Sequence, residues 1–227
     1  MCIDLRFFGR RRGRPLHIKN KILIDTLLPK LSIKEPKLNQ YLDPWALFAS
    51  NTRELWLEIG FGSGEHLAWQ AGANPDIGFI GCEIFLNGIA SLLSYIDRQN
   101  LKNIRIFAND VRHLFLIMPP TSLYRVFLLF PDPWPKRRHI KRRFICHDNL
   151  DQLSLLMVDG AELRIATDDN IAKAWITNQM KNYKNFQNIT ENPLVKSEDW
   201  PITRYEIKAQ EQCRQSIFLR YQHYIEN

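Results

Sequence analysis

A glycine-rich turn directly follows a short apolar segment that carries one acidic residue. The segment is Leu55-Trp-Leu-Glu-Ile59, its acid is Glu58, and the glycines are Gly60, Gly62 and Gly64. Glycine permits positive φ and lets a ligand approach the backbone, so such a turn after a strand is typical of a site for a nucleotide-like ligand. A carboxylate beside the turn would repel a pyrophosphate group, whereas it suits a ligand with positive charge.

Two more acids, Glu83 and Asp110, follow the next two apolar segments. The glycine spacing is G-x-G-x-G, which differs from the G-x-G-x-x-G of dinucleotide sites and from the P-loop. We therefore predict S-adenosylmethionine as the ligand, because it carries sulfonium and ammonium groups. Glu83 is then expected to accept hydrogen bonds from ribose hydroxyls, and Asp110 to lie near the adenine. Alternatively, all three carboxylates cap helices or form turns; three acids at three successive strand ends favour the ligand.

A fourth acid, Asp132, lies in a proline-rich loop after another apolar segment. Prolines at 131, 133 and 135 surround Asp132 and Trp134, and basic residues follow at once. Because proline fixes φ, the loop is expected to hold Asp132 rigidly at the carboxyl edge of the sheet. For Pro-Asp-Pro alone, a stiff surface turn with Trp134 in the core would be the better interpretation. The adjoining cations favour a functional loop.

Positive charge is concentrated in two segments of a 227-residue chain whose formal net charge is +7. Residues 6–14 contain five arginines and residues 136–143 contain six lysines or arginines, with no acid in either segment. Without those eleven, 20 basic residues stand against 24 acidic ones. A concentrated basic patch binds polyphosphate well, because each neutralised phosphate releases counterions. One such segment alone is usually a solvated loop or arm; two on an otherwise acidic chain predict a nucleic acid partner.

Apolar and amphipathic segments alternate along the chain. This alternation predicts a doubly wound α/β fold, a Rossmann-like parallel sheet with helices on both faces. The expected strands are Leu55–Ile59, Ile77–Cys82, Ile104–Phe107, Tyr124–Phe130 and Ala161–Ala166, with Ser216–Tyr221 as an antiparallel strand finishing the sheet. The expected helices are 18–31, Phe85–Arg98, Asn149–Met157 and Asp169–Met180.

The remaining composition excludes several classes of protein. The four cysteines lie far apart without a C-x-x-C pair, which argues against a zinc site or a disulfide framework and favours a reducing cytoplasm. No metal site is expected. Every long apolar stretch is interrupted by charge or proline, so neither a membrane span nor a membrane partner is expected. His66, His113 and His139 show no catalytic or metal-binding pattern and are interpreted as surface or packing residues.

Five blocks of the sequence closely resemble the bacterial tRNA (guanine-N(7)-)-methyltransferase family. They are Leu57-Glu-Ile-Gly-Phe-Gly-Ser-Gly64, Gly81-Cys-Glu-Ile-Phe-Leu-Asn-Gly88, Phe130-Pro-Asp-Pro-Trp-Pro-Lys136, Arg164-Ile-Ala-Thr-Asp168 and Asp199-Trp-Pro-Ile-Thr-Arg-Tyr-Glu206. The resemblance implies a class I methyltransferase fold with a mostly parallel seven-stranded sheet. It implies S-adenosylmethionine as donor and guanosine 46 of the tRNA variable loop as acceptor. Residues 1–50 are then a basic arm with a helical extension, and residues 51–227 the methyltransferase domain.

The same resemblance implies roles for individual residues. Asp132 is expected to be the catalytic residue. Donor binding is expected from Glu58, Gly60, Gly62, Gly64, Glu83, Asp110 and Asp132. Substrate contacts are expected from Lys136, Asp168, Thr203, Arg204, Tyr205 and Glu206. The RNA backbone is expected to contact Arg138, His139, Ile140, Lys141, Arg142 and Arg143. No obligate protein partner is implied, and both a monomer and a homodimer are compatible with the sequence.

The chemistry of the guanine N7 atom agrees with this set of residues. N7 has a lone pair in the neutral base and needs no strong general base before it attacks a methyl sulfonium. Catalysis can therefore rest on alignment, and a carboxylate such as Asp132 or Asp168 can bind the Watson–Crick edge and stabilise the developing positive charge. Because A-form RNA hides N7 in a deep groove, the target guanine must lie in a loop or leave its stack.

Two alternatives stay open. The chain could methylate a base amine of another RNA or of DNA, or it could be a non-catalytic RNA-binding module on the same fold. Without the resemblance, the segment Thr203–Glu206 would be interpreted as a strand edge in which Thr203 caps and Arg204 pairs with Glu206. One departure from the family is visible, because a glycine usual in this region is missing from Lys208-Ala-Gln-Glu-Gln-Cys-Arg214. The local turn there is in question.

Overall fold

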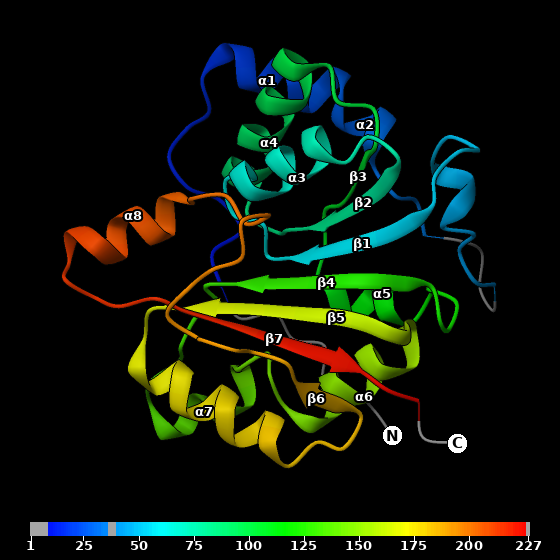
Figure 1. Cartoon of the computed structure of the whole chain (residues 1–227). Helices are drawn as coiled ribbons and strands as arrows, with labels where there is room; N and C mark the ends of the chain where they lie inside the picture. Colours follow the sequence, from blue (N-terminus) through cyan, green and yellow to red (C-terminus); the bar gives the residue numbers. More distant parts are fainter. Residues whose placement is uncertain (1–8, 36–39, 226–227) are drawn as a thin grey trace. The chain divides into compact units, whose positions relative to one another are not determined.

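The computed structural model describes residues 9–35 and 40–225. Arg6, one arginine of the basic N-terminal segment, lies outside the described residues. The chain divides into two compact units, Met1–Pro119 and Pro120–Asn227. Each unit has its own set of neighbouring strands (Figure 1).

The first unit contains three parallel strands in the order β3-β2-β1. All six residues of the central strand are buried, as its uninterrupted apolar sequence predicts. Because the strands are parallel, their carboxyl ends lie at one edge, where Glu58, Glu83 and Asp110 follow or end them. The strands are β1 (Glu54–Ile59), β2 (Ile77–Cys82) and β3 (Ile104–Phe107).

Three helices of the first unit, α3, α4 and α5, bury apolar residues. In the most amphipathic of them, α4, the predicted stripe with Ile89, Leu93 and Ile96 is buried. Helix α1 lies against α4 (Figure 1). The helices are α1 (Ile18–Thr26), α2 (Leu28–Leu31), η1 (Trp45–Leu47), α3 (Glu65–Ala73), α4 (Leu86–Gln99) and α5 (Val111–Phe115).

The single helix expected at 18–31 is wrong, because the structure has α1 and α2 with Leu27 between them. Pro29 explains the break. Proline has no N–H to donate inside a helix and is favoured in a first turn, where Pro29 lies in α2.

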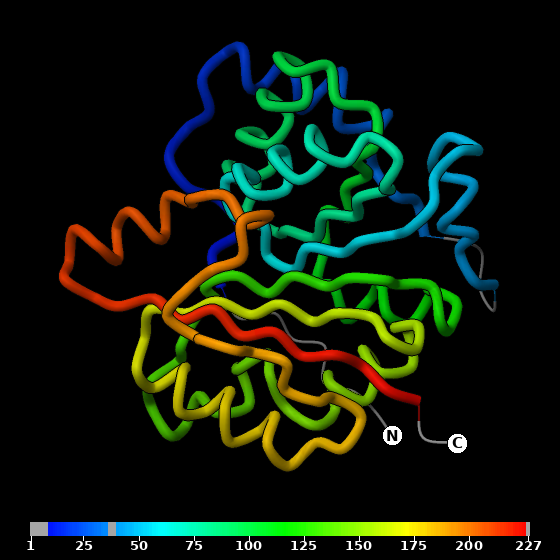
Figure 2. The backbone as a smooth tube through the Cα atoms, in the orientation of Figure 1, coloured from blue at the N-terminus to red at the C-terminus, as the bar shows by residue number. Residues whose placement is uncertain are grey.

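The second unit contains four strands in the order β4-β5-β7-β6. β4 is parallel to β5, whereas β7 is antiparallel to both β5 and β6. The chain leaves β6, passes through α8 and returns as β7 between β5 and β6 (Figure 2). The strands are β4 (Leu123–Leu129), β5 (Met157–Thr167), β6 (Phe186–Asn188) and β7 (Ile217–His223). The helices are η2 (Arg137–Arg142), α6 (His147–Leu156), α7 (Asn170–Lys181) and α8 (Arg204–Glu211).

The doubly wound α/β class is confirmed. The part of the chain that the structure describes has seven strands, mostly parallel, with an antiparallel strand at the C-terminus. That strand does not finish the sheet, however, because the unpredicted β6 lies beyond it. β6 has three residues, of which only Phe186 is buried, so its sequence is too short for an alternating pattern. Among the described residues, no helix is long and apolar enough to span a membrane.

Candidate functional site

The glycine turn at the end of β1 has the backbone that its sequence predicts. Gly60, Gly62 and Gly64 all have positive φ, at 68°, 56° and 79°. A Cβ added to Gly64 would lie 2.7 Å from the Leu92 side chain, so helix α4 also requires this glycine. At Gly60 an added Cβ would meet no atom within 4 Å, which leaves the backbone open to a ligand. The turn therefore fits the close approach of a donor molecule.

Glu83, which follows β2, stabilises this turn by hydrogen bonding. Its Oε2 accepts a hydrogen bond from the Gly62 amide at 2.9 Å, and its Oε1 accepts from the amides of Ile84 and Phe85 at 2.7 and 2.9 Å. The start of α4 packs equally tightly, because a Cβ on Gly88 would lie 2.1 Å from the Gly62 carbonyl oxygen. Glu83 thus joins the two loops, and its carboxylate has limited acceptor capacity left for a ribose.

Glu58 is almost wholly buried, with 3% of its surface exposed. Its Oε2 lies 2.7 Å from Nδ1 of His66, which is on α3 and is also 3% exposed. Nε2 of His66 in turn lies 3.3 Å from the Gln70 side-chain amide. From sequence alone, only a surface or packing role is expected for His66. Its spacing from Glu58 spans a turn and the start of a helix, so no local pattern signals the contact.

Asp110 has the contacts of a helix cap, which was the alternative interpretation. It is the N-cap of α5, and its Oδ1 accepts from the Arg112 backbone amide at 2.9 Å. The Arg112 guanidinium binds both carboxylate oxygens, at 3.0 Å to Oδ1 and 2.6 Å to Oδ2. Between these acids, burial raises the pKa of the Cys82 thiol, and the negative charges of Asp110 and Glu83 raise it further. Cys82 is therefore a neutral thiol beside the candidate donor residues.

The loop of Asp132 is held in shape by its neighbours. Phe130 and Trp134, on either side of Pro131-Asp-Pro133, both have positive φ, at 51° and 43°. Such conformations are strained for non-glycine residues and cluster at functional sites. Arg143 donates to the Trp134 carbonyl at 3.1 Å and so closes the loop. Asp132 itself is exposed and lines a small hollow at this loop.

The basic segment that follows forms the short helix η2, and its residues have different surroundings. Arg142 lies over the Trp134 ring at 4.8 Å, and Arg143 over the Trp175 ring at 4.6 Å. Both guanidinium groups therefore support the loop, beyond the RNA contact that the sequence predicts for them. Desolvation and the cations of Arg142, Arg138 and Lys136 lower the pKa of His139, so this imidazole adds little positive charge.

Most of the other side chains of this basic segment are more exposed to solvent than those of Arg142 and Arg143. The side chains that reach solvent are Lys136, Arg137, Arg138, Ile140 and Lys141. The cations among them are the ones the structure leaves most accessible to a phosphate.

Asp168 follows β5 and forms an ion pair with Arg214 at 2.9 Å. The turn that carries Arg214 ends α8 in a Schellman motif, in which the Arg214 amide donates to Ala209 O and the Cys213 amide to Gln210 O. Cys213 has a φ of 51°, the left-handed conformation that favours glycine. The turn is therefore present without the family's glycine, and it brings Arg214 to Asp168.

The segment Thr203–Glu206 begins α8, so its interpretation as a strand edge is wrong. The capping expected of Thr203 is correct, because its hydroxyl accepts from the Glu206 amide at 3.3 Å. The Glu206 carboxylate is buried and binds Lys196 through both oxygens, at 2.9 and 3.1 Å. Tyr205 stacks on Phe130, with ring centroids 5.9 Å apart. This contact brings the Asp132 loop and the start of α8 together.

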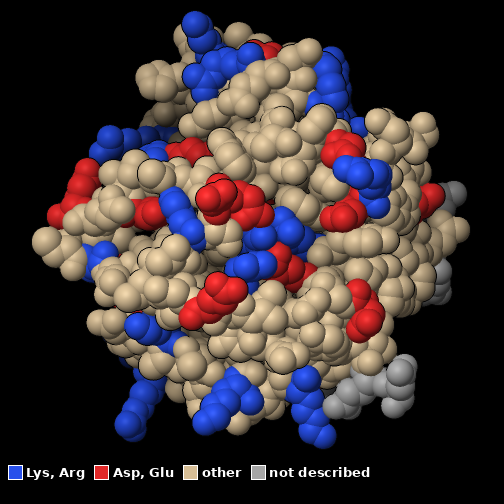
Figure 3. All heavy atoms as spheres, viewed as in Figure 1, with Lys and Arg blue, Asp and Glu red and all other residues tan. Residues whose placement is uncertain are grey.

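A buried charge cluster on the sheet of the second unit was not predicted. Arg164, which is 2% exposed, donates to Glu162 at 3.0 Å and to Asp199 at 2.8 Å. Arg125 and Arg220 also pair with Glu162. Burial opposes the ionisation of Glu162 and Asp199, but the arginines outweigh it and lower the pKa of both. Asp199 and the buried Trp200 thereby attach the segment that leads to Thr203. Figure 3 shows basic and acidic side chains intermingled at the centre of the face in view.

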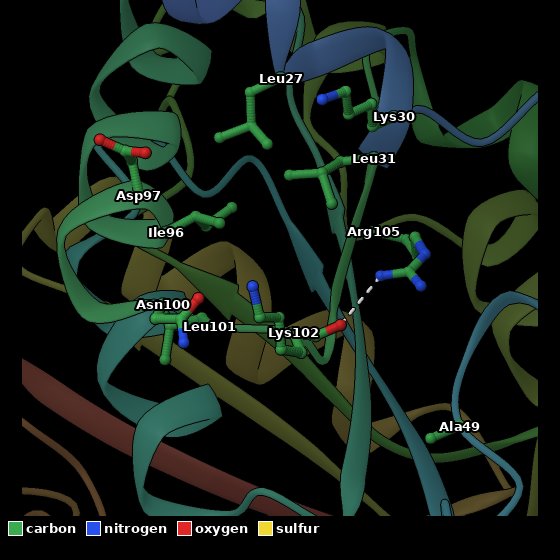
Figure 4. A pocket seen from close by; sticks show the side chains of 10 residues that line it. All are labelled: Leu27, Lys30, Leu31, Ala49, Ile96, Asp97, Asn100, Leu101, Lys102 and Arg105. Atoms are coloured by element: carbon green, nitrogen blue, oxygen red, sulfur yellow. Dashed lines mark hydrogen bonds between the residues drawn. The ribbon is translucent and has the colours of Figure 1, made fainter.

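A separate hollow in the first unit lies at the amino end of β3 (Figure 4). Lys30, Lys102 and Arg105 line it together with Asp97 at the end of α4. Arg105 donates to the Lys102 carbonyl at 3.1 Å, and burial lowers the pKa of its guanidinium. A helix C-terminus disfavours an anion. None of the predicted site residues lines this hollow, and we assign it no part in the candidate site.

Comparison with solved structures agrees with this architecture. An rRNA methylase from Streptococcus thermophilus aligns with a TM-score of 0.54 at 9% identity, covering 77% of this chain and 89% of that one. The 16S rRNA methyltransferase KamB aligns with a TM-score of 0.57 at 12% identity, covering 85% and 99%. At such low identity the likeness concerns the fold alone. The fold that it shows is the one found in class I methyltransferases.

Sequence relatives specify the family. A family model described as "Putative methyltransferase" matches residues 52–219. The tRNA (guanine-N(7)-)-methyltransferase of Paramagnetospirillum magneticum is 48% identical over 90% of this chain and 87% of its own length. Those of Rhodospirillum rubrum and Zymomonas mobilis are 43% and 42% identical, each over 95% of this chain and over 87% and 93% of their own lengths. The chain is an enzyme that belongs to the tRNA (guanine-N(7)-)-methyltransferase family.

Proposed function

We propose that this enzyme transfers a methyl group from S-adenosylmethionine to N7 of guanosine 46 in the tRNA variable loop, giving 7-methylguanosine. The main support is the name shared by relatives that are 42–48% identical over at least 90% of the chain. The geometric support is the Phe130–Tyr205 stack, which brings two groups of predicted substrate residues together. The activity would be cytoplasmic, where tRNA is found.

The first unit supplies the residues for the donor. The open backbone at Gly60 fits a ligand that approaches closely, and the buried Glu58 fits a ligand with positive charge. Glu83 and Asp110 shape the loops around this position through their hydrogen bonds to Gly62 and Arg112. When bound, S-adenosylmethionine supplies an electrophilic methyl group on a sulfonium.

The second unit supplies the residues for the guanine. Asp132 is exposed on a rigid loop, so its carboxylate is free to accept hydrogen bonds from the N–H groups of the Watson–Crick edge. Thr203 and Glu206 are fixed by the α8 cap and by Lys196. N7 is already a nucleophile in the neutral base, so these residues need only orient it. As positive charge develops on the purine, the Asp132 carboxylate stabilises it more than it stabilises the ground state.

RNA binding is assigned to the exposed cations after Trp134, with Lys136, Arg138 and Lys141 as the main phosphate contacts. Arg142 and Arg143 hold the loop on which these side chains stand. A rigid basic loop next to Asp132 would bind the phosphates that flank the target nucleotide and thereby present its base.

The test is methyl transfer from labelled S-adenosylmethionine to unmodified tRNA, followed by digestion and identification of the nucleoside. We expect 7-methylguanosine, and we expect none from a tRNA in which guanosine 46 is replaced by adenosine. N6-methyladenosine would instead support the alternative of a base-amine methyltransferase. Binding of tRNA without binding of S-adenosylmethionine would support the non-catalytic RNA-binding module.

A further inference from the structure

A chain of polar side chains runs along one face of α3 and ends on Glu58. His66 and Gln70 are four residues apart and lie on the same face of the helix, and Asn74, four residues further on, is its C-cap. His66 and Gln70 are buried, at 3% and 1% exposure. A buried carboxylate is costly to keep ionised unless it receives hydrogen bonds. The chain therefore bears on the charge of a residue to which we assign donor binding.

The directions of the hydrogen bonds follow from one backbone carbonyl. The Gln70 carbonyl can only accept, so the group of Asn74 that lies 2.9 Å from it is the NH₂ group. The same NH₂ group lies 3.4 Å from the side-chain oxygen of Gln70. This contact orients the Gln70 amide, whose own NH₂ group then faces Nε2 of His66 at 3.3 Å.

The tautomer of His66 follows from this orientation. Nε2 accepts a hydrogen bond from Gln70, so it carries no proton, and the proton of the neutral ring is on Nδ1. Nδ1 lies 2.7 Å from Glu58 and donates to it. In the three side-chain contacts the donors are thus Asn74, Gln70 and His66 in turn, and the last of them donates to the Glu58 carboxylate.

We propose that His66 is a positioning residue for the methyl donor, held as the neutral Nδ1–H tautomer so that Glu58 stays ionised and fixed in place beside the glycine turn. An imidazolium would cancel the charge of Glu58, whereas the neutral ring leaves it to attract a cationic ligand. This inference rests on the proposed function, which assigns Glu58 to the donor site. It adds a residue that the sequence blocks do not single out for chemistry.

The first test is the tautomer of His66 in the full-length protein. Long-range ¹H–¹⁵N NMR distinguishes the Nδ1–H tautomer, the Nε2–H tautomer and the imidazolium, and the His66→Asn variant identifies the His66 signals. We expect the Nδ1–H tautomer. Either of the other two forms would overturn the proposal.

The second test compares two substitutions at the same buried position. His66→Asn keeps an N–H donor near the place of Nδ1, whereas His66→Leu removes it at similar volume. Calorimetry should show S-adenosylmethionine binding weakened about 10-fold or more by His66→Leu, because the lost hydrogen bond is to a charged group. His66→Asn should recover most of that affinity. Equal affinity of the two variants would contradict the proposed role.

A ligand without positive charge distinguishes an electrostatic role of His66 in donor binding from a merely structural role. 5′-Methylthioadenosine lacks the sulfonium and the ammonium, and its affinity can be measured by competition. His66→Leu should weaken S-adenosylmethionine much more than this ligand, while equal losses would indicate a merely structural role. Leu67→Met, a volume-conserving change at a buried neighbour on α3, is the packing control and should affect neither ligand.

A third variant covers the case in which His66→Leu does not fold. Gln70→Met removes the donor to Nε2 and should replace the single Nδ1–H signal with other protonation forms, together with weaker S-adenosylmethionine binding. An unchanged tautomer and affinity would overturn the proposal. If the wild-type protein does not bind S-adenosylmethionine, the proposed function itself fails, which is a different outcome from wild-type binding that His66 variants leave unchanged.

Discussion

The ring of Phe130 stacks on that of Tyr205, with the two planes 16° apart and the centroids separated by 5.9 Å. Phe130 directly precedes the Pro131-Asp-Pro133 loop, and Tyr205 lies in the first turn of α8. The contact therefore joins the residue proposed for catalysis to the helix that carries Thr203 and Glu206 at its start. It connects positions that are 75 residues apart in sequence.

Removing the Tyr205 ring should uncouple these two elements. We expect Tyr205→Ala to lower kcat/KM for tRNA while the affinity for S-adenosylmethionine stays unchanged, because a stacked aromatic pair contributes about 0.5–1.5 kcal/mol. Tyr205→Phe keeps the ring and is the matched control. Steady-state methylation kinetics and calorimetry check this, and a Tyr205→Phe variant as impaired as Tyr205→Ala would assign the effect to the hydroxyl instead.

Asp132→Ala should reduce methyl transfer about 100-fold or more, since the variant loses the carboxylate that stabilises the developing charge. The affinity for tRNA should change little, because Asp132 is proposed to contact one base while the cations are proposed to contact the backbone. Single-turnover transfer and a filter-binding assay measure the two effects. Glu191→Ala, at an exposed acid on a different loop, is the control. Near-normal turnover of Asp132→Ala would refute the assigned role.

The salt dependence of tRNA binding should separate the exposed cations from the supporting ones. Arg138→Ala with Lys141→Ala should flatten the slope of log affinity against log salt by about 0.7–0.9 for each lost phosphate contact. Arg143→Ala should instead loosen the loop, because its guanidinium binds the Trp134 carbonyl and covers Trp175. It should lower the unfolding temperature more than the double variant does. Equal slopes for all variants would contradict this division.

Cys213→Gly should stabilise the protein by about 0.5–1 kcal/mol, because residue 213 has the left-handed conformation at the end of α8. In a chain of this size that corresponds to a rise of about 2–4 °C per kcal/mol in the unfolding temperature. Thermal and urea unfolding measure the change. Cys213→Val, which places a β-branched residue at positive φ, should destabilise. A stabilising Cys213→Val would show that the turn differs from the one described.

The Arg164–Asp199 ion pair should make stability depend on acidity. The arginines lower the folded-state pKa of Asp199, so the pair stabilises the protein above the unfolded-state pKa, about 3.9, and the benefit is lost as pH falls through the lowered value. Asp199→Asn should therefore cost more free energy of unfolding at pH 6 than at pH 3. Urea unfolding at both values tests this. An equal cost would mean that the carboxylate charge contributes nothing.

Local patterns were sufficient for most of the fold. β2 and β3 have the predicted bounds, and the apolar stripe of α4 is buried. Burial on one face leaves a periodic apolar pattern in the sequence, and burial on both faces leaves a continuous apolar run. The helix break at Leu27 and the three-residue β6 were missed. Pro29 was a local signal that the apolar spacing outweighed, whereas β6 is defined only by its pairing with β7.

The sequence alone determined which acids stand at the strand ends and which loop carries the cations, since parallel strands bring their carboxyl ends to one edge. It could not determine which other groups of the protein those side chains contact. Glu58 receives His66 from the next helix, and Arg143 turns back to the Trp134 carbonyl. These pairings depend on the angle at which a helix or loop returns after a turn, and residue spacing does not encode that angle. Only the tertiary structure decided that Arg142 and Arg143 support the loop and that His66 lies behind Glu58.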